Sequence, residues 1–306
     1  MHIDEGTAGG GKVIILPRSR RNRPASGRYG EYEVISPIAR GGMGGVYLAA
    51  HVATGERVAL KVLDPQLASH PDLASRLFNE HRYASSARHP GLLEIREARR
   101  SADGVPYLVM EHLTGQTLGE IAEERRVGLA EIIAISAQVA SALAALHAAG
   151  VMHCDVKHDN VFVLAGPGGG WPRAKVIDFG VSRRIGEPIE DGSIAGTPWC
   201  MAPEQWQGRP QAASDVYALG CMLYNLITGV PPFDGSLPEL MTAHLERRPT
   251  RPGRLAPIPP ALERLILRAL SKQAANRPTM VEVARELEAL AAGYLAPEAA
   301  ELRAAC

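Results

Sequence analysis

Several features that mark particular protein classes are scarce in this sequence. Its 306 residues include only four cysteines, at positions 154, 200, 221 and 306, too few and too scattered for a disulfide framework. Lysine plus arginine and aspartate plus glutamate each number 33, so the formal net charge is zero. A chain without net charge has no overall electrostatic attraction to nucleic acid or to an anionic membrane. These shortages argue against a secreted disulfide-rich domain and against specific nucleic-acid binding, and they favour a reducing, cytoplasmic compartment.

Long hydrophobic runs are scarce as well. The apolar run at residues 13–16 is too short for a secretory signal and is followed by arginines. Residues 129–149 are mostly apolar but include Glu131, Gln138 and His147, so we expect a buried core helix and no membrane span. Apolar residues make up 46% and charged residues 22%, as in a soluble globular protein. The length allows about two compact units or one large two-lobed fold.

The pattern of apolar residues changes along the chain. Residues 1–27 are glycine-rich and then basic, which predicts a disordered tail. Short β-rich runs then surround one helical stretch, and helices dominate after about residue 113. The expected strands are Tyr32–Pro37, Val46–His51, Arg57–Leu63, Tyr107–Glu111, 161–164 and 174–177. The expected helices are 71–87, 129–149, 216–228 and 261–272. A small sheet-rich lobe therefore precedes a larger helical one.

A glycine-rich segment joins the first two β-rich runs. It reads Ile38, Ala39, Arg40, Gly41, Gly42, Met43, Gly44, Gly45 and Val46. A hairpin tip without Cβ atoms lets backbone N–H groups approach phosphate oxygens closely. Such a cluster alone is more often an ordinary turn, so a phosphate site is predicted only if residues later in the chain support it.

A lysine and a glutamate that could form an ion pair occur next in the sequence. Lys61 lies in the β-rich run Arg57–Leu63, and Glu80 lies in the expected helix, 19 residues later. A lone strand lysine is ordinarily an exposed surface residue. Paired with Glu80, it would instead be held towards bound phosphates.

Two polar segments in the second lobe carry the strongest signal. Residues 153–160 bring together Asp155, Lys157 and Asn160, and Asp178 follows a short apolar strand 23 residues after Asp155. The first aspartate can accept a hydroxyl proton, and the lysine can neutralise phosphate charge. Oxygens of the asparagine and of Asp178 are ligands that suit Mg²⁺.

In this order, these elements resemble the eukaryotic-type (Hanks-type) serine/threonine protein kinase family, particularly its bacterial members, over roughly residues 28–290. Residues 196–204 are similar to the family's substrate-docking loop and A-P-E motif. Asp215 matches the aspartate that braces the catalytic loop, and Arg277 matches the arginine that pairs with the A-P-E glutamate, here Glu204.

The resemblance implies an α+β fold with two kinase-like lobes. We expect a kinase domain over 28–292, preceded by the tail 1–27 and followed by a C-terminal tail over 293–306. The domain would comprise a β-rich lobe with one helix (28–110), a hinge (111–115) and a mainly helical lobe (116–292).

The resemblance also implies a role for each matching residue. Catalysis would involve Asp155, which orients and deprotonates the acceptor hydroxyl, Lys157, which touches the γ-phosphate, and Lys61, which contacts the α- and β-phosphates. Asn160 and Asp178 would hold Mg²⁺, or Mn²⁺ in its place. The residues expected to bind ATP are Ile38, Ala39, Arg40, Gly41, Gly42, Met43, Gly44, Gly45, Val46, Ala59, Lys61, Glu80, Glu111, Leu113 and Phe162. Among them, Glu111 C=O and Leu113 N–H would hydrogen-bond adenine.

Three positions depart from the family pattern, and one of them, His158 in place of the usual proline, faces away from the chemistry, so we expect it to have little effect. Ala39 replaces the first loop glycine, where an extended backbone would tolerate it. Cys154 replaces the usual arginine, which binds the phosphate of an activation loop, and a cysteine cannot form that bidentate contact. Of the hydroxyls between Asp178 and Glu204, Thr197 matches the residue that bonds to the catalytic aspartate and lysine, which leaves Ser182 and Ser193. We hypothesise that activity does not depend on activation-loop phosphorylation.

The sequence predicts an enzyme that uses ATP and Mg²⁺ to phosphorylate serine or threonine on proteins. A pseudokinase that binds nucleotide or acts as a scaffold is the main alternative, although it has no chemical need for all of Lys61, Glu80, Asp155, Asn160 and Asp178. A small-molecule phosphotransferase is a further alternative, but it would not need the docking loop at 196–204. The expected partners are ATP and protein substrates, with no membrane span, and no expectation is set for the oligomeric state.

Overall fold

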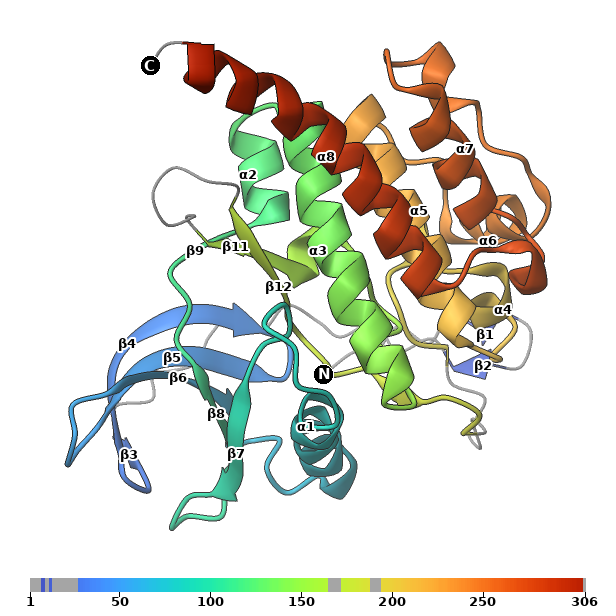
Figure 1. Cartoon of the computed structure of the whole chain (residues 1–306). Coiled ribbons are helices and arrows are strands. Elements are labelled where there is room, and N and C mark those ends of the chain that lie inside the picture. The colour runs from blue at the N-terminus through green and yellow to red at the C-terminus, as the bar shows by residue number, and fades with distance from the viewer. Residues whose placement is uncertain (1–6, 9–10, 13–26, 165–171, 188–193, 305–306) are drawn as a thin grey trace.

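The computed structural model describes residues 7–8, 11–12, 27–164, 172–187 and 194–304, with side chains from residue 27 to residue 294. Within these ranges the chain forms two lobes, a twisted β-sheet with one helix and a larger group of helices (Figure 1). The predicted two-lobed α+β fold is therefore confirmed.

A six-stranded antiparallel sheet forms the first lobe. Its strand order is β3-β4-β5-β6-β8-β7. The strands are β3 (Arg28–Tyr29), β4 (Tyr32–Gly41), β5 (Gly44–His51), β6 (Arg57–Leu63), β7 (Ile95–Arg100) and β8 (Pro106–Glu111). The single helix of this lobe, α1 (Pro71–Ala84), packs beside β7 and β8.

Alternation along β6 decides where Lys61 points. Val58, Leu60 and Val62 are buried in one cluster on one face of the sheet. Successive strand residues point to opposite faces, so Ala59 and Lys61 face the other way. That second face is the one that α1 covers, and Ala59 belongs to the main core there.

The hairpin between β4 and β5 is longer than predicted. Strand pairing continues to Gly41 opposite Gly44, beyond the expected end of the first strand at Pro37. Register shifts between Val34 and Ser36 and between Pro37 and Ala39 allow the ladder to continue past the proline. The predicted glycine-rich segment is thus the end of a β-hairpin.

Helix boundaries also differ from the predictions by a few residues. Helix α1 ends at Ala84 instead of residue 87, because the Ser86 N–H and hydroxyl both bond to the Tyr83 carbonyl and break the i to i−4 pattern. Helix α5 begins four residues earlier than predicted, at Ala212, and α7 spans Pro260–Ala269.

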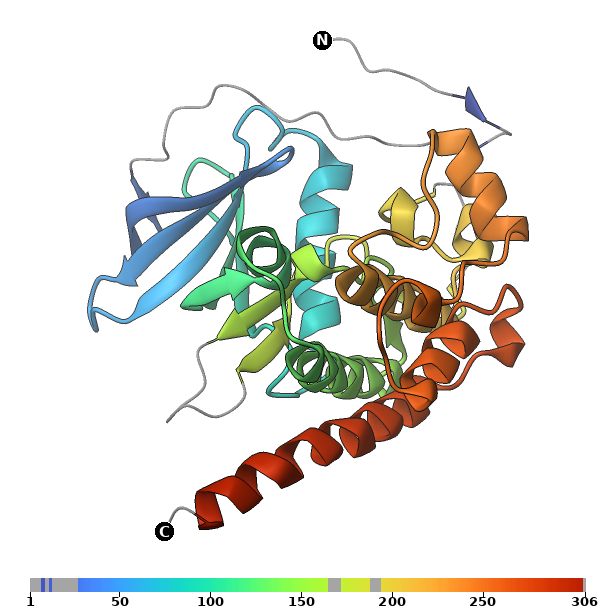
Figure 2. The same ribbon diagram turned by 90° about the horizontal axis from the view of Figure 1, so that it is seen from above.

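Helices build the second lobe around one core. They are α2 (Leu118–Glu124), α3 (Leu129–Ala148), α4 (Pro203–Trp206), α5 (Ala212–Thr228), α6 (Leu237–Glu246), α7 (Pro260–Ala269) and α8 (Met280–Ala304). Among the described residues, α3 alone is long and apolar enough to cross a bilayer. Most of its surface is buried, and α8 lies along it in both Figures 1 and 2. A helix that is apolar on every face belongs in such a core.

Short strands at the lobe boundary carry the polar loops. Strands β9 (Gly115–Thr117), β11 (Val161–Leu164) and β12 (Arg173–Val176) form one small sheet, and β10 (Val151–Met152) pairs with β13 (Arg183–Arg184). Residues 165–171, which join β11 to β12, lie outside the described residues. So does most of the predicted N-terminal tail, except for β1 (Thr7–Ala8) paired with β2 (Gly11–Lys12). The predicted boundary at residue 292 falls inside the continuous helix α8.

Candidate active site

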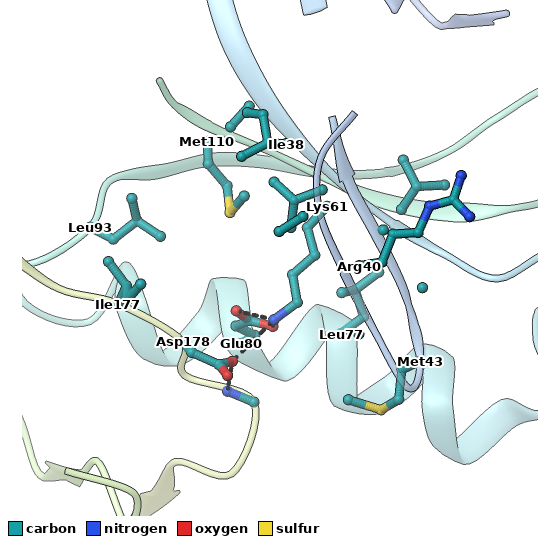
Figure 3. Close-up of a pocket in the computed structure, with 18 of the residues that line it drawn as sticks. Ile38, Arg40, Met43, Lys61, Leu77, Glu80, Leu93, Met110, Ile177 and Asp178 are labelled. Carbon is teal, nitrogen blue, oxygen red and sulfur yellow. Dashed lines mark hydrogen bonds and ion pairs between the residues drawn. The ribbon is translucent and has the colours of Figure 1, made fainter. Parts of the chain in front are cut away.

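Three charged groups from distant parts of the sequence meet between the lobes. The Lys61 ammonium on β6 lies 2.8 Å from both carboxylate oxygens of Glu80 on α1 and 3.1 Å from Asp178 Oδ1. Figure 3 shows this Lys61 side chain pointing to both carboxylates. The predicted Lys61–Glu80 pair is therefore present, and it joins the sheet, α1 and the second lobe at one point.

The electrostatics of this cluster keep Lys61 and Asp178 charged, whereas burial raises the pKa of Glu80. The Lys61 ammonium, against the opposing effect of burial, lowers the pKa of Asp178 to about 2. In turn, the carboxylates of Asp178 and Glu80 raise the pKa of Lys61 despite its burial. A lysine and an aspartate that remain ionised at neutral pH can each act on a phosphate, the first directly and the second through a cation.

A second group of side chains surrounds Asp155. Asn160 Nδ2 donates to Asp155 Oδ2 at 3.0 Å, and the Lys157 ammonium lies 2.9 Å from the same oxygen. The hydroxyl of Thr197 donates to Asp155 Oδ1 and accepts from Lys157, both at 2.6 Å. The structure thus brings Asp155, Lys157 and Asn160 together, with Lys61 in the neighbouring cluster, and Thr197 forms the contacts that were expected of it.

Asp215 fixes the loop that carries Asp155. It is 1% exposed, and its carboxylate accepts the backbone N–H groups of His153 and Cys154, both at 2.8 Å. His147 Nε2 lies 2.7 Å from the same carboxylate. Against burial, these partners lower the pKa of Asp215, so the brace is anionic. The hydrogen bonds from the backbone of His153 and Cys154 to Asp215 are the contacts expected of an aspartate that braces the catalytic loop.

Two residues of the site hold left-handed backbone conformations. Cys154 has φ 67° and Asp178 has φ 63°, and within the described part of the chain they are the only non-glycine residues with positive φ. Such conformations cost of order 1–3 kcal/mol each and persist where neighbouring contacts enforce them. The Asp215 bond to the Cys154 N–H and the Lys61 bond to Asp178 are contacts of that kind.

A cavity of about 650 Å³ lies between the lobes beside these groups. Every residue predicted to bind ATP lines it, and so do Asn160 and Asp178. Lys61, Glu80 and Asp178 make one end polar, whereas Met110 and Ile177 gather at the other end (Figure 3). A cavity with one apolar end and one charged end suits a flat base attached to phosphates. The binding roles of the individual residues remain predictions.

The glycine-rich hairpin forms one wall of the cavity. At Gly44 a Cβ atom would lie 2.0 Å from the Val62 carbonyl oxygen, so the sheet itself requires glycine there. Ala39 is not among the positive-φ residues, which agrees with its expected tolerance of this position. Met43 at the tip lies near Leu77 of α1 (Figure 3).

Sequence reasoning missed part of the lining. Met110 and Ile177 directly precede Glu111 and Asp178, and that adjacency could have identified them. Leu93 lies in the connection before β7 and carries no local signal. Its place in the cavity depends on how that connection folds against the second lobe.

The oxygen atoms near Asp178 fit a magnesium ion. Asn160 Nδ2 donates to the carbonyl and the carboxylate of Asp155, so the amide oxygen of Asn160 is the atom that can face a metal. Asp178 Oδ1 already accepts a hydrogen bond from Lys61. The described part of the chain has no cluster of three or more His, Cys, Asp or Glu side chains that could hold a metal. Mg²⁺ needs no such cluster, because it is commonly held by one or two protein oxygens together with phosphates and water.

A buried ion pair anchors the predicted docking loop. Arg277 Nη1 lies 2.6 Å from Glu204 Oε1, and Arg277 Nη2 lies 2.9 Å from Glu204 Oε2. Gln205 Nε2 donates to the Cys154 carbonyl at 2.9 Å, which joins the loop to the segment that carries Asp155. The predicted pair is present, and it fixes residues 196–204 next to the catalytic loop.

Cys154 is packed inside the protein. Its side chain is buried, and burial, followed by the Asp215 carboxylate, raises the pKa of the thiol well above its usual range. A protonated, buried thiol is neither an anion receptor nor a reactive nucleophile. The side chain therefore acts as a small neutral filler where the family pattern has a cation.

Comparison with known proteins agrees with this geometry. A family model described as the protein kinase domain matches residues 32–287. Serine/threonine-protein kinase Pkn1 of Myxococcus xanthus is 38% identical over 257 residues, which cover 82% of this chain and 36% of Pkn1. Serine/threonine-protein kinase pkn3 of the same organism is 38% identical over 275 residues, which cover 85% of this chain and 50% of pkn3.

A solved structure is similar over most of the chain. The crystal structure of a double mutant of the Mycobacterium tuberculosis PknI kinase domain matches with a TM-score of 0.68 and 26% identity, and the match covers 89% of this chain and 100% of that one. By contrast, the chain spans only about a third to a half of the length of its curated relatives.

Proposed function

The chain belongs to the protein kinase domain family, and on that premise we propose that it is an ATP- and Mg²⁺-dependent serine/threonine protein kinase. The observation that carries the proposal is the joint assembly of two groups, one lining the cavity and the other reaching it through Asn160. Lys61, Glu80 and Asp178 form one, and Asp155 with its partners forms the other. A phosphoryl-transfer enzyme needs both groups in place at the same time.

Each group has a task that its geometry supports. ATP bound with Mg²⁺ supplies an electrophilic γ-phosphoryl group with part of its charge neutralised. Asp155 orients the acceptor hydroxyl and takes its proton, while Lys157, 2.9 Å away, offsets negative charge beside it. Lys61 holds the α- and β-phosphates, and Glu80 keeps the Lys61 ammonium in that position.

The contacts of Thr197 favour serine and threonine as acceptors. Its hydroxyl bridges Asp155 and Lys157, so the docking loop lies close against the catalytic carboxylate. A small aliphatic hydroxyl reaches that carboxylate more readily than a phenolic ring does. Labelled products should therefore carry phosphate on serine or threonine and not on tyrosine.

Activity would not require a phosphorylated activation loop. Cys154 offers no cation to receive a phosphate, because its thiol is buried and stays protonated. Ser182 is buried and donates to a carbonyl, which leaves Ser193, outside the described residues, as the remaining candidate. Ser193→Ala should retain activity within about threefold. A tenfold or greater loss would overturn this part of the proposal.

The experiment tracks transfer of labelled γ-phosphate from ATP to the chain itself and to a generic protein acceptor, with Asp155→Ala beside it. Transfer by the parent alone is the expected result. If neither protein transfers phosphate while ATP still raises the melting temperature, the pseudokinase alternative is favoured. Protein substrates and a cytoplasmic location belong to the same proposal.

A further inference from the structure

The hinge after β8 is held by a cation that the catalytic groups do not use. The Lys175 ammonium on β12 lies 2.7 Å from Glu111 Oε1, the carboxylate of the last residue of β8. Both side chains are largely buried, with 16% and 20% of their surfaces exposed. The pair joins the two lobes, because β12 belongs to the second lobe and β8 to the first (Figure 1).

The same two side chains also hold the connection before β7. Lys175 donates to the Leu92 carbonyl at 3.1 Å, and Glu111 Oε1 accepts the Glu94 N–H at 2.8 Å. Backbone bonds reinforce the attachment, since the Leu93 N–H donates to the Val176 carbonyl at 3.0 Å. The lysine, the glutamate and this connection therefore form a single unit.

This unit touches the apolar end of the cavity at two places. Leu93 and Glu111 both line the cavity, and each is held by a member of the unit. Lys175 itself is not among the lining residues, so it acts only through them. No carboxylate other than Glu111 is within ion-pair distance of Lys175 in the described part of the chain.

We propose that Lys175 is a positioning residue that pre-organises the adenine end of the cavity by holding Glu111 and the Leu92–Glu94 connection in place. The proposal rests on the proposed function, because it assumes that a purine base occupies that end. Without the ammonium, the largely buried Glu111 carboxylate is better solvated by turning outward, and the backbone N–H of Glu94 then loses its acceptor. The hinge and Leu93 would have to be ordered again on binding, which lowers affinity for the base.

Adenosine contains the base but no phosphate, so its affinity measures the effect of Lys175 on the adenine end without any contribution from phosphate contacts. Lys175→Met should raise the Kd for adenosine and the Kd for ATP by the same factor, about fivefold. Lys61→Met should raise the Kd for ATP while leaving adenosine unchanged, because Lys61 lies at the charged end. In steady-state transfer, Lys175→Met should raise the KM for ATP with kcat within about twofold, since Asp155 and its partners are untouched.

Three further variants distinguish positioning from general stabilisation. Lys175→Arg keeps a cation within reach of Glu111 and should restore most of the adenosine affinity. Arg99→Met removes an exposed cation of β7, paired with Glu97 and not with any member of the unit, and should leave both affinities unchanged. The double variant Lys175→Met/Glu111→Gln should bind adenosine no more weakly than Lys175→Met alone, because both changes break one unit.

Adenosine affinity within twofold of the parent in Lys175→Met would overturn the proposal, as would unequal losses for ATP and adenosine. Failure of Lys175→Arg to restore binding would also overturn it. A parent that binds adenosine but transfers no phosphate would refute the proposed kinase activity and leave the positioning test intact. A parent that binds no adenosine would refute both.

Discussion

Replacing Arg277 by methionine should leave a buried glutamate without its cation. The Arg277 side chain has no exposed surface, and its guanidinium makes five hydrogen bonds. Two go to Glu204, at 2.6 and 2.9 Å. The others go to the carbonyls of Ala213, Ser271 and Lys272, at 2.8, 2.8 and 3.2 Å. Methionine has a similar length but cannot donate to any of these acceptors.

The loss of stability in Arg277→Met is set by the charge of Glu204, which stays buried without its partner. Removing one partner of a buried ion pair typically costs about 3–5 kcal/mol, because the other charge stays buried and uncompensated. Glu204 would keep a single donor, the Ser214 hydroxyl at 2.6 Å from Oε1. A loss of this size should lower the melting temperature by about 6–20 °C in a domain of this size.

Urea unfolding at neutral pH measures the change directly, and Arg268→Met is the matched control. Arg268 pairs with Glu286 on the surface, with 48% and 42% of the two side chains exposed, and its loss should cost less than about 1 kcal/mol. If Arg277→Met were destabilised by no more than Arg268→Met, the reasoning about the buried pair would be refuted.

Two further predictions concern backbone crowding and pH. Gly44→Ala should destabilise the chain by more than about 2 kcal/mol because of the clash with the Val62 carbonyl, whereas Gly41→Ala, with open space around it, should cost under about 1 kcal/mol. Denaturation curves of both variants check this, and equal losses would contradict it. Burial, then the Lys272 ammonium, lowers the pKa of His244 from 6.5 to about 3, so the unfolded chain binds a proton that the folded chain rejects between these values. Stability should therefore fall by about 2 kcal/mol between pH 7 and pH 5, and His244→Gln should remove that part of the slope; an unchanged slope would count against it.

The sequence was most informative where chemistry is carried by short, ordered motifs. Asp155, Lys157 and Asn160 lie within six residues, so their proximity in one loop could be predicted before any fold was known. The Lys61–Glu80 and Glu204–Arg277 pairs join residues that are distant in sequence. They could be predicted only through the family resemblance, because residue spacing alone does not specify contacts between separate elements.

Contacts between elements without a motif were not predictable. Lys175 and Glu111 are 64 residues apart in the sequence, and neither belongs to a motif that predicts contact with the other. Helix ends were uncertain for a different reason. Periodicity locates the apolar face of a helix, but the last turn depends on capping contacts, as at Ser86 after α1. The extended β4–β5 hairpin likewise depends on register shifts that the sequence pattern does not reveal.

Transfer of labelled γ-phosphate from ATP/Mg²⁺ to a protein acceptor, by the parent chain and by Asp155→Asn, tests the central claim most directly. Asparagine preserves the size of the side chain and its bond to Thr197 but cannot take a proton from the acceptor. The account predicts phosphoserine or phosphothreonine with the parent and at least a hundredfold slower transfer with Asp155→Asn, while ATP raises the melting temperature of both proteins. Equal rates for the two proteins, or phosphate found only on tyrosine, would contradict it.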